Sequence, residues 1–313
     1  FENMHAGSRL LTRGGGKRAI MGTGAWRRYQ SEGGEGMRIT ARAQAKINWS
    51  LDVCAGRDDG YHELDMLMQR VDLSDVLTFE RARFLTLTVN GRALPVGGRN
   101  LVMQAAQALN AHMGKRFGAR IALAKHIPIR AGLGGGSADC AATLIALNRL
   151  WELRLPVDEL LKIGRTLGAD VPYCIAGGFA RVRGMGEKIA ALGGGERFPL
   201  VLLHVGRGLS TAQVFAEYDR VGRTLGLDNE ALARAICERD FEKMDALSGN
   251  ALEAPSISLM PEIGAPLARL RAAGARVARM SGSGSAVFGV FRTAAEALHA
   301  AEALPGAIFT WTC

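Results

Sequence analysis

The stretch PIRAGLGGGSAD, residues 128–139, is the most informative part of this sequence, because a helical pattern begins directly after its glycines. Four of the five residues from Gly132 to Gly136 are glycine, so backbone N–H groups can approach an anion with no Cβ in the way. The start of the following helix adds unpaired N–H groups and the positive end of the helix dipole. The stretch therefore predicts a phosphate-binding loop. A flexible turn between a strand and a helix is the alternative.

The loop differs from the better-known phosphate motifs. No G-x-x-x-x-G-K-[ST] sequence occurs in the chain, and Ser137 stands where the dinucleotide fingerprint has its third glycine. Ser137 suits two roles equally, a helix cap or a magnesium ligand. Asp139 falls in the expected first turn, where interaction with the helix dipole explains it. By itself the loop indicates phosphate binding and names no cofactor.

Composition indicates a soluble globular protein of about two domains. The chain has 313 residues, of which 48% are hydrophobic and 22% charged. No uncharged stretch approaches the ~18 apolar residues of a membrane span. The 39 Lys and Arg exceed the 30 Asp and Glu, which suits an anionic partner, although a solvated basic surface explains the excess as well. The five cysteines are scattered without zinc-ligand spacing, which indicates reduced thiols and a cytoplasmic location.

Strand and helix patterns are mixed along the chain, which predicts an α+β protein. Residues 45–53 alternate apolar and polar, so we expect a half-buried strand with one polar face. That face carries Lys46, Asn48, Ser50 and Asp52. Asn100 is expected to cap a helix at 101–112. Further helices are expected at 137–153, 156–168 and 258–273, and a strand around 173–183.

Two features indicate the limits of the folded parts. Residues 1–36 are rich in Gly and Arg and carry no sustained period, so we expect a disordered extension or a cloning remnant before a native start at Met37. The run Gly193-Gly194-Gly195-Glu196 is the expected junction between a first domain at 37–195 and a second domain at 196–313.

Two residues outside the loop suit phosphoryl transfer, which needs a carboxylate to accept a hydroxyl proton and a cation to offset phosphate charge. Asp170 lies in GADVP, residues 168–172, at an expected turn between a helix and a strand. Lys46 lies on the polar face of the first strand. Taken alone, Asp170 is explained as a turn or capping residue, and Lys46 is explained as a solvated lysine.

Three blocks occur in order along the chain: AKIN at 45–48, the glycine loop, and MSGSGS at 280–285. This order resembles the three-motif pattern of the superfamily of galactokinase, homoserine kinase, mevalonate kinase and phosphomevalonate kinase. Within it, GRDDGYHEL at 56–64 and GADVP at 168–172 look like the 4-diphosphocytidyl-2-C-methyl-D-erythritol kinase family. The resemblance runs from about Met37 to the C-terminus. It implies a two-domain α+β kinase fold with the active site in the interdomain cleft.

The resemblance also implies a reaction. ATP would phosphorylate the 2-hydroxyl of diphosphocytidyl-methylerythritol, a step of non-mevalonate isoprenoid precursor synthesis. Asp170 matches the family's catalytic base, and Lys46 matches the lysine beside it. Magnesium is expected from the chemistry, with Ser137 as a ligand. The matching ATP-binding positions are Gly132, Leu133, Gly134, Gly135, Gly136, Ser137, Ala138, Asn100 and Lys125.

On the substrate side, the resemblance implies that a cytosine ring stacks between Tyr61 and Phe215, and that His62 hydrogen-bonds it. An aromatic pair suits a flat base, because the π-face of every base is worth ~1–3 kcal/mol in stacking. A tight turn between two strands is the alternative for residues 281–285. The other substrate-side positions are Asn48, Thr211, Gly282 and Ser283.

Two other functions fit parts of this pattern. A homoserine or mevalonate kinase shares the loop, but its substrate offers nothing for a stacking aromatic such as Tyr61. A nucleic-acid-binding protein would interleave aromatics with Lys and Arg along one face, whereas aromatics make up only 6% of this chain. We therefore expect a small-molecule substrate, no nucleic-acid or membrane partner, and a monomer or weak homodimer.

Overall fold

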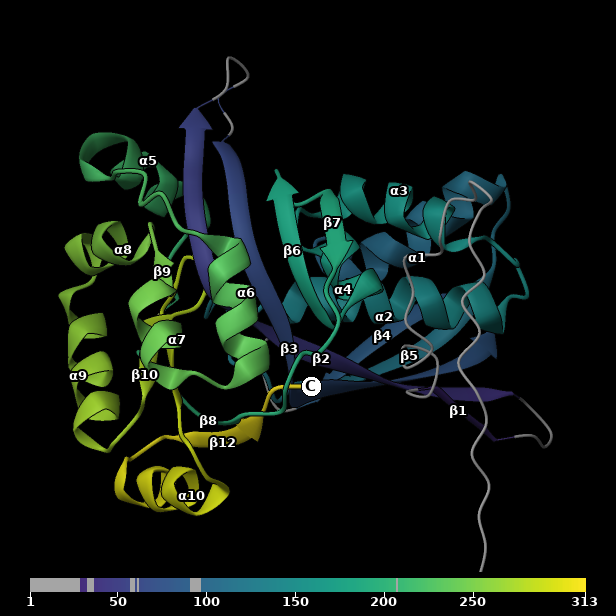
Figure 1. Ribbon diagram of the computed structural model, residues 1–313. Coiled ribbons are helices and arrows are strands. Elements are labelled where there is room, and N and C mark those ends of the chain that lie inside the picture. The colour runs from purple at the N-terminus through teal and green to yellow at the C-terminus, as the bar shows by residue number, and fades with distance from the viewer. Residues whose placement is uncertain (1–28, 33–36, 57–59, 61, 91–96, 207) are drawn as a thin grey trace, which may run out of the picture.

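The computed structural model describes residues 29–32, 37–56, 60, 62–90, 97–206 and 208–313. In this part of the chain the strands form two sheets with helices packed beside both, which confirms the α+β class (Figure 1). The larger sheet contains β1 (Tyr29–Glu32), β2 (Arg38–Gly56), β3 (His62–Ala82), β4 (Leu85–Asn90), β5 (Gly118–Ala124), β6 (Phe179–Gly184), β7 (Lys188–Ala191) and β9 (Gly249–Asn250). The smaller sheet contains β8 (Pro199–His204), β10 (Val277–Met280), β11 (Ala286–Val290) and β12 (Ile308–Trp311).

The long antiparallel pair β2 and β3 organises the larger sheet. β3 has 21 residues, so its two halves have different neighbours: residues 76–82 pair with β5, and residues 64–69 pair with β6. β4 completes that edge of the sheet by pairing with β5 in parallel. β2 likewise pairs with β1 near its start and with β9 near its end. The two long strands therefore reach both parts of the molecule (Figure 1).

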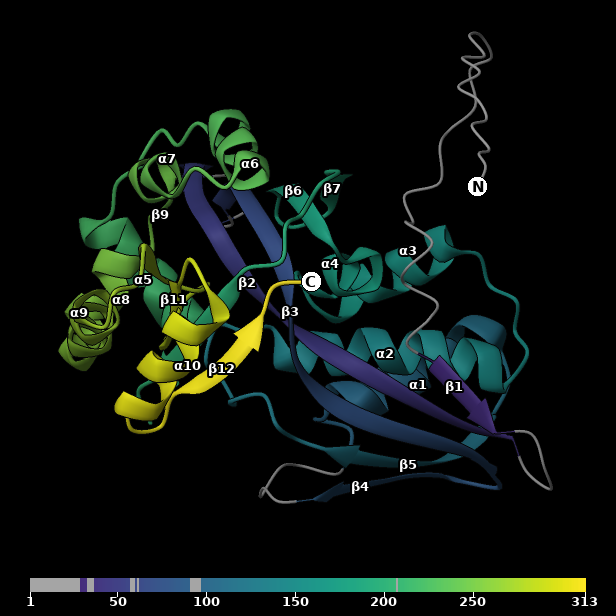
Figure 2. The ribbon, with the colours of Figure 1, turned by 60° about the horizontal axis from the view of Figure 1, so that its bottom comes forward.

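Four helices cover one face of the larger sheet (Figure 2). Asn100 caps the first by accepting the N–H of Val102 at 3.0 Å, which confirms the predicted cap. The second is buried along almost its whole length, because it packs against the sheet on one side and against other helices around it. These helices are α1 (Leu101–Met113), α2 (Gly135–Leu150), α3 (Val157–Leu167) and α4 (Val171–Ala176).

The remaining helices pack around the smaller sheet, on the other side of β2 and β3 (Figure 1). They are α5 (Thr211–Val221), α6 (Asn229–Glu238), α7 (Phe241–Leu247), α8 (Glu253–Leu259), the short 3-10 helix η2 (Pro261–Ile263), α9 (Gly264–Ala272) and α10 (Ala294–Ala303). The C-terminus returns to the larger sheet, where Thr312 pairs with Val71 and the N–H of Cys313 donates to the carbonyl of Arg70 at 2.9 Å. The chain end therefore joins the two parts.

Three expectations about elements need correction. The strand expected around 173–183 is a helix, α4, in its first half, because Pro172 suits a first helical turn and Gly177 ends it at a φ of 68°. The helix expected at 258–273 is broken into α8, η2 and α9 around Pro261, which removes a backbone donor. Within the segment expected to be disordered, residues 29–32 form β1 and pair with β2.

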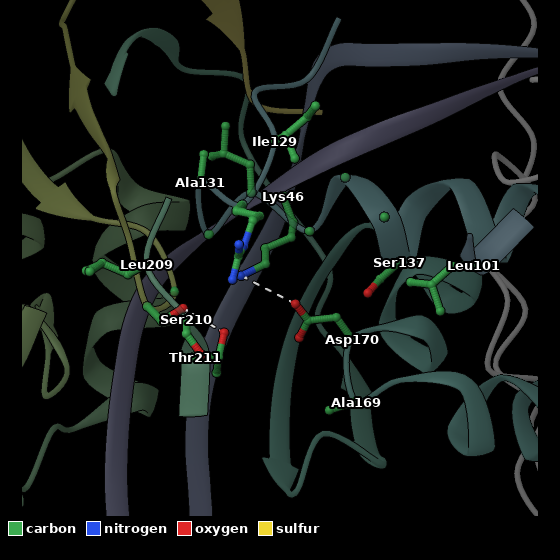
Figure 3. Close-up of a pocket in the computed structure, with 18 of the residues that line it drawn as sticks. Lys46, Leu101, Ile129, Ala131, Ser137, Ala169, Asp170, Leu209, Ser210 and Thr211 are labelled. Carbon is green, nitrogen blue, oxygen red and sulfur yellow. Dashed lines mark hydrogen bonds and ion pairs between the residues drawn. The ribbon is translucent and has the colours of Figure 1, made fainter. Parts of the chain in front are cut away.

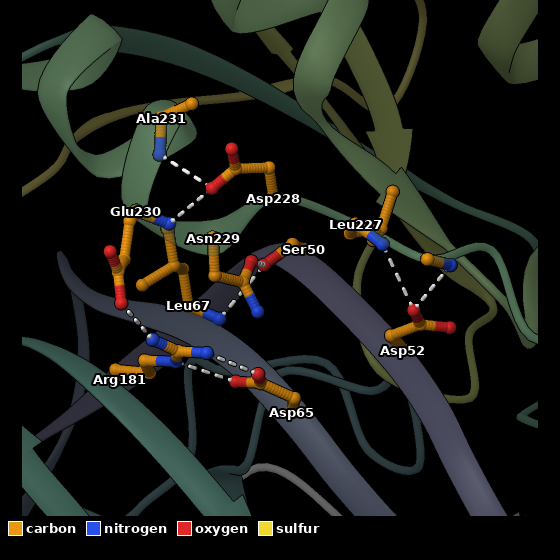
Figure 4. A network of polar contacts seen from close by, with 11 residues as sticks. Ser50, Asp52, Asp65, Leu67, Arg181, Leu227, Asp228, Asn229, Glu230 and Ala231 are labelled. Atoms are coloured by element: carbon orange, nitrogen blue, oxygen red, sulfur yellow. Dashed lines mark hydrogen bonds and ion pairs between the residues drawn. The ribbon is translucent and has the colours of Figure 1, made fainter.

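The expected polar face of β2 is also wrong. Both faces of residues 45–53 are buried, and a bulge between Asn48 and Ser50 interrupts the alternation of side chains. Lys46 and Asn48 contact each other on one side of the sheet. Ser50 and Asp52 instead contact the segment that leads into α6 (Figure 4).

A network of polar groups, buried at Ser50, Asp52 and Asn229, joins the long strands to α6 (Figure 4). The Asp52 carboxylate accepts the backbone N–H groups of Leu225, Gly226 and Leu227 at 2.8, 2.8 and 3.1 Å. Beside it, the Arg181 guanidinium donates to Asp65 at 2.7 Å and to Glu230 at 3.2 Å, and Ser50 binds Asn229. A loop without regular structure is thereby held against β2.

A second buried cluster fixes the strand end before the glycine loop. Lys125 follows β5, and its ammonium binds Asp75 of β3 and, at 2.7 Å, Asp139 of α2. The Asp75 carboxylate also accepts the N–H groups of His126 and Ile127 at 2.6 and 2.9 Å. Asp139 is the fifth residue of α2, so its partner is Lys125 and not the helix dipole as expected. Burial raises the pKa of Asp139 to about 8.

Replacing Asp52 by Ala should lower the free energy of unfolding by about 2–4 kcal/mol, because three backbone N–H groups lose a buried charged acceptor. Urea denaturation measures the change. Asp72→Ala is the control: this carboxylate pairs with Arg197 at 2.6 Å, but the two side chains are 43% and 61% exposed, so the loss should stay below ~1 kcal/mol. Equal losses in the two variants would contradict the role given to Asp52.

The Asp139 carboxyl should make stability depend on pH. Its pKa is about 8 in the folded protein and ~3.9 in an unfolded chain, so the folded state holds the proton more tightly. This contribution is complete below about pH 4 and is lost as the pH rises through 8. Asp139→Asn cannot lose a proton, so the variant should gain stability relative to wild type between pH 5 and 8 in urea denaturation. A difference independent of pH would contradict the assignment.

Candidate active site

A cavity of about 820 Å³ opens between the glycine loop and the C-terminal part of the chain. Its volume lies within the ~300–1,000 Å³ of small-molecule sites. Segments from both parts line it: β2, β3, the start of α1, the glycine loop, the start of α4, and residues 209–215 and 282–283. Figure 3 shows Lys46 and Asp170 in the middle, with Leu209, Ser210 and Thr211 on one side and Leu101 and Ser137 on the other.

The glycine loop crosses the cavity from one side to the other. Gly132 and Gly134 have φ angles of 77° and 70°, in the left-handed region where a side chain is strained. Gly132 packs so closely on the carbonyl of Ser281 that a Cβ there would overlap it. At the other end Gly136 lies beside Leu101 of α1. One end of the loop thus contacts the C-terminal part, and the other contacts α1.

The structure excludes one of the two roles that Ser137 suited, the helix cap. Gly134 is the residue at the N-cap of α2, and Ser137 is the third residue of the helix, so Ser137 does not cap it. Ser137 lines the cavity, whereas Ala138 does not. The N–H of Ala138 donates to the carbonyl of Gly134 at 2.8 Å and its side chain is buried. Ala138 is therefore set back from the cavity.

Lys46 is buried at the centre of the cavity wall. Its ammonium donates to Asn48 Oδ1 at 2.7 Å and lies 3.7 Å from Asp170 Oδ2. Its backbone N–H donates to the carbonyl of Leu133 at 3.0 Å, and its carbon chain passes under Gly134. Strand β2, the glycine loop and α4 therefore meet at one side chain.

Asp170 occupies the N-cap position of α4, and its side chain makes no capping hydrogen bond. Residues 171–175 of α4 are buried, which fixes the helix from behind. The Asp170 side chain itself is 35% exposed and lines the cavity. A carboxylate in this position has one charged neighbour, Lys46, and an open side toward the cavity.

The expected substrate side is assembled from three segments. Thr211 Oγ1 lies 3.0 Å from Ser283 Oγ, and Thr211, Phe215, Gly282 and Ser283 all line the cavity. The His62 ring stacks on Phe215 with centroids 4.8 Å apart. Tyr61 lies outside the described residues.

Two contacts on this side had no signal in the sequence. Asn250, in the short strand β9, donates to the carbonyls of Met280 and Gly282 at 2.9 and 2.8 Å, which shapes the turn at 281–283. The His62 Nε2 lies 2.7 Å from Asp219 Oδ1 of α5. Each partner is distant in sequence and carries a common polar side chain, so only the folded chain identifies it.

The expected ATP side combines residues of α1, β5 and α2. Asn100 and Lys125 line the cavity here, as expected, together with Leu101 and Ser137. The Lys125 ammonium is already bound by the carboxyl groups of Asp75 and Asp139, and the Asp75 carboxylate offsets its charge. Among the described residues there is no group of three His, Cys, Asp or Glu side chains that could hold a metal ion. Over the same residues, no helix is long and apolar enough to cross a membrane.

Comparison with known proteins places this arrangement in a family. The family described as GHMP kinases N terminal domain matches residues 100–178, and GHMP kinases C terminal matches residues 232–308. The 4-diphosphocytidyl-2-C-methyl-D-erythritol kinase of Pelotomaculum thermopropionicum is 44% identical over 256 residues, which cover 81% of this chain and 89% of that protein. The enzyme of the same name from Bacillus velezensis is 41% identical, covering 81% and 88%.

Solved structures agree. A crystal structure of 4-(cytidine 5'-diphospho)-2C-methyl-D-erythritol kinase matches with a TM-score of 0.75 and 36% identity, over 87% of this chain and 98% of that one. The homoserine kinase from Cytophaga hutchinsonii matches with a TM-score of 0.60 over 87% and 95%, and its 20% identity supports the fold alone. The fold is thus the expected two-domain kinase fold. The chain belongs to the 4-diphosphocytidyl-2-C-methyl-D-erythritol kinase family of GHMP kinases and is an ATP-dependent small-molecule kinase.

Proposed function

We propose that this kinase transfers the γ-phosphoryl group of ATP to the 2-hydroxyl of 4-diphosphocytidyl-2-C-methyl-D-erythritol. The names of its relatives support the substrate. The observation that carries the chemistry is the meeting of Lys46 and Asp170 beside the glycine loop, 3.7 Å apart. A carboxylate and an ammonium at this place match the two needs of phosphoryl transfer, a proton acceptor and a cation.

Asp170 would act as the general base. Its side chain makes no capping hydrogen bond and lines the cavity, so a carboxylate oxygen is open to a substrate hydroxyl. As the hydroxyl oxygen attacks the γ-phosphorus, its proton would pass to this carboxylate. The buried helix behind Asp170 holds the carboxylate in place, which favours catalysis by positioning.

Lys46 would stabilise both the ionised base and the transferred phosphoryl group. Its ammonium is held by Asn48, so it needs no reorganisation when negative charge develops nearby. The carbon chain lies under Gly134, and the ammonium therefore points from the phosphate loop toward the base. Asn48 acts in this proposal by fixing the ammonium, and it also lines the substrate side.

The ATP phosphates would lie along residues 132–137, where the glycines and the start of α2 present backbone N–H groups. The donors present fit a magnesium ion: Ser137 offers a hydroxyl oxygen in the cavity, and Mg²⁺ takes most of its other ligands from phosphates and water. Bound there, the ion would neutralise phosphate charge. Asn100 and Lys125 would shape the nucleotide end of the site.

The cytosine ring of the acceptor would stack on Phe215, with His62 supplying a hydrogen bond and Tyr61 the second ring. Support comes from Phe215, which lines the cavity, and from the stacking of the His62 ring on it. Thr211, Gly282 and Ser283 would hold the rest of the acceptor.

The division into domains at 37–195 and 196–313 belongs to the same proposal, because every strand of the smaller sheet comes from the second of these segments. A monomer or weak homodimer, a cytoplasmic location and the absence of a nucleic-acid partner stay predictions.

Asp170→Asn should lower kcat by ~10²–10⁴-fold, with KM values for both substrates within a few-fold of wild type, because the amide keeps the shape and loses the base. ADP release is measured with ATP, magnesium and the cytidyl acceptor. Homoserine and mevalonate serve as control acceptors. Turnover of a control acceptor by the wild-type enzyme would contradict the proposed substrate. Full activity of Asp170→Asn would contradict the role of Asp170 as general base.

Phe215→Ala should raise KM for the acceptor by ~5–100-fold and leave KM for ATP unchanged, because only the cytosine loses a stacking surface. Phe215→Tyr, which keeps the ring, should restore the value to within a few-fold. Steady-state kinetics with each substrate varied in turn separates the two constants. An equal rise in both KM values would show that Phe215 maintains the shape of the whole cavity and does not specifically bind the cytosine ring.

A further inference from the structure

Four cationic side chains of the described residues line the cavity, and they differ in whether the protein already offsets their charge. Lys46 lies beside Asp170, and Lys125 is bound by two carboxylates. Arg99 and Arg130 are exposed and form no ion pair or hydrogen bond with any residue that the structure describes. The proposed reaction brings the triphosphate of ATP and the diphosphate of the acceptor into this cavity. Among the described residues, the two arginines are therefore the lining cations without a protein partner.

The two arginines stand at opposite ends of the glycine loop. Arg99 precedes Asn100 and Leu101, and Leu101 lies beside Gly136 at the end of the loop that enters α2. Arg130 begins the loop at its other end. Its carbonyl and Cβ pack against Gly208, three residues before α5. In Figure 3 the neighbouring Ala131 accordingly lies on the side of Leu209, away from Leu101.

The backbone of Arg130 is also unusual. It has a φ of 56°, in the left-handed region that residues with a Cβ rarely adopt. Of the four non-glycine residues with a positive φ in the described chain, it alone lines the cavity. The packing against Gly208 holds this conformation and keeps the arginine next to the segment that carries Thr211 and Phe215.

We propose that Arg130 binds the diphosphate of the nucleotide-linked acceptor. A guanidinium matches phosphate oxygens by paired, charge-assisted hydrogen bonds. The ATP phosphates have the N–H groups of the loop and of α2, whereas the acceptor side carries no other cation without a carboxylate partner among the described residues. The inference rests on the proposed function. It adds a residue that binds the diphosphate of the acceptor, whereas Phe215 and His62 would bind its cytosine ring.

Arg130→Gln should raise KM for the acceptor by ~10–100-fold, the range for loss of a charged hydrogen bond, and leave KM for ATP and kcat within ~3-fold. Arg99→Gln is the matched control, because it removes an equally exposed cation from the other end of the loop and should leave KM for the acceptor unchanged. Arg130→Lys, which keeps the charge without the fork, should fall between wild type and Arg130→Gln. A rise in KM for ATP, with KM for the acceptor unchanged, would show that Arg130 binds ATP and would overturn the proposal.

A binding measurement tests the same residue without turnover. Calorimetry compares cytidine diphosphate with cytidine, which differ only in the diphosphate. Wild type should bind cytidine diphosphate at least ~10-fold more tightly than cytidine. Arg130→Gln should lose most of this affinity ratio and keep its affinity for cytidine. An unchanged ratio in folded Arg130→Gln protein would overturn the proposal. Failure of the proposed function has another signature, which is the absence of wild-type turnover with the cytidyl acceptor.

Discussion

The buried ammonium of Lys46 is the interaction on which the rest of the cavity depends. A buried charge is costly unless it is paired and hydrogen-bonded, and Lys46 meets this demand with Asn48 at 2.7 Å and Asp170 at 3.7 Å. Its backbone at the same time binds Leu133 in the glycine loop. The positions of β2, the loop and α4 are therefore linked. A shift in any of them would leave a charge without its partner.

The bulge in β2 explains how one strand serves both parts of the molecule. An extra residue between Asn48 and Ser50 changes which side the polar groups face. Lys46 and Asn48, before the bulge, line the cavity, and Asp52 beyond it binds the loop that leads into α6. The wall of the proposed active site and its attachment to the C-terminal part are thus built from one continuous strand.

Local sequence signals predicted local features well. Glycines at 132–136 directly before a helical pattern predicted the loop, and Asn100 predicted its cap, because both depend on a few neighbouring residues. The strand expected around 173–183 failed because a short apolar run does not distinguish a buried helix from a strand. Asp75 gave no signal at all, since its partner Lys125 lies beyond the end of another strand, distant in sequence. The bulge after Asn48 could not be predicted either, because residues 45–53 alternate apolar and polar without a break, as in a regular strand.

The sequence by itself determined the α+β class, the glycine loop before a helix, the kinase family and the candidate pair of Lys46 and Asp170. These follow from contiguous blocks whose backbone demands and residue types are local. Only the tertiary structure decided which groups face the cavity: the side chain of Ala138 is buried, Lys125 is bound between two carboxyl groups, and Arg130 has no ion pair or hydrogen bond with the described residues at one end of the loop. The reason is physical. Burial and charge pairing depend on residues brought together from distant segments, and no local pattern records them.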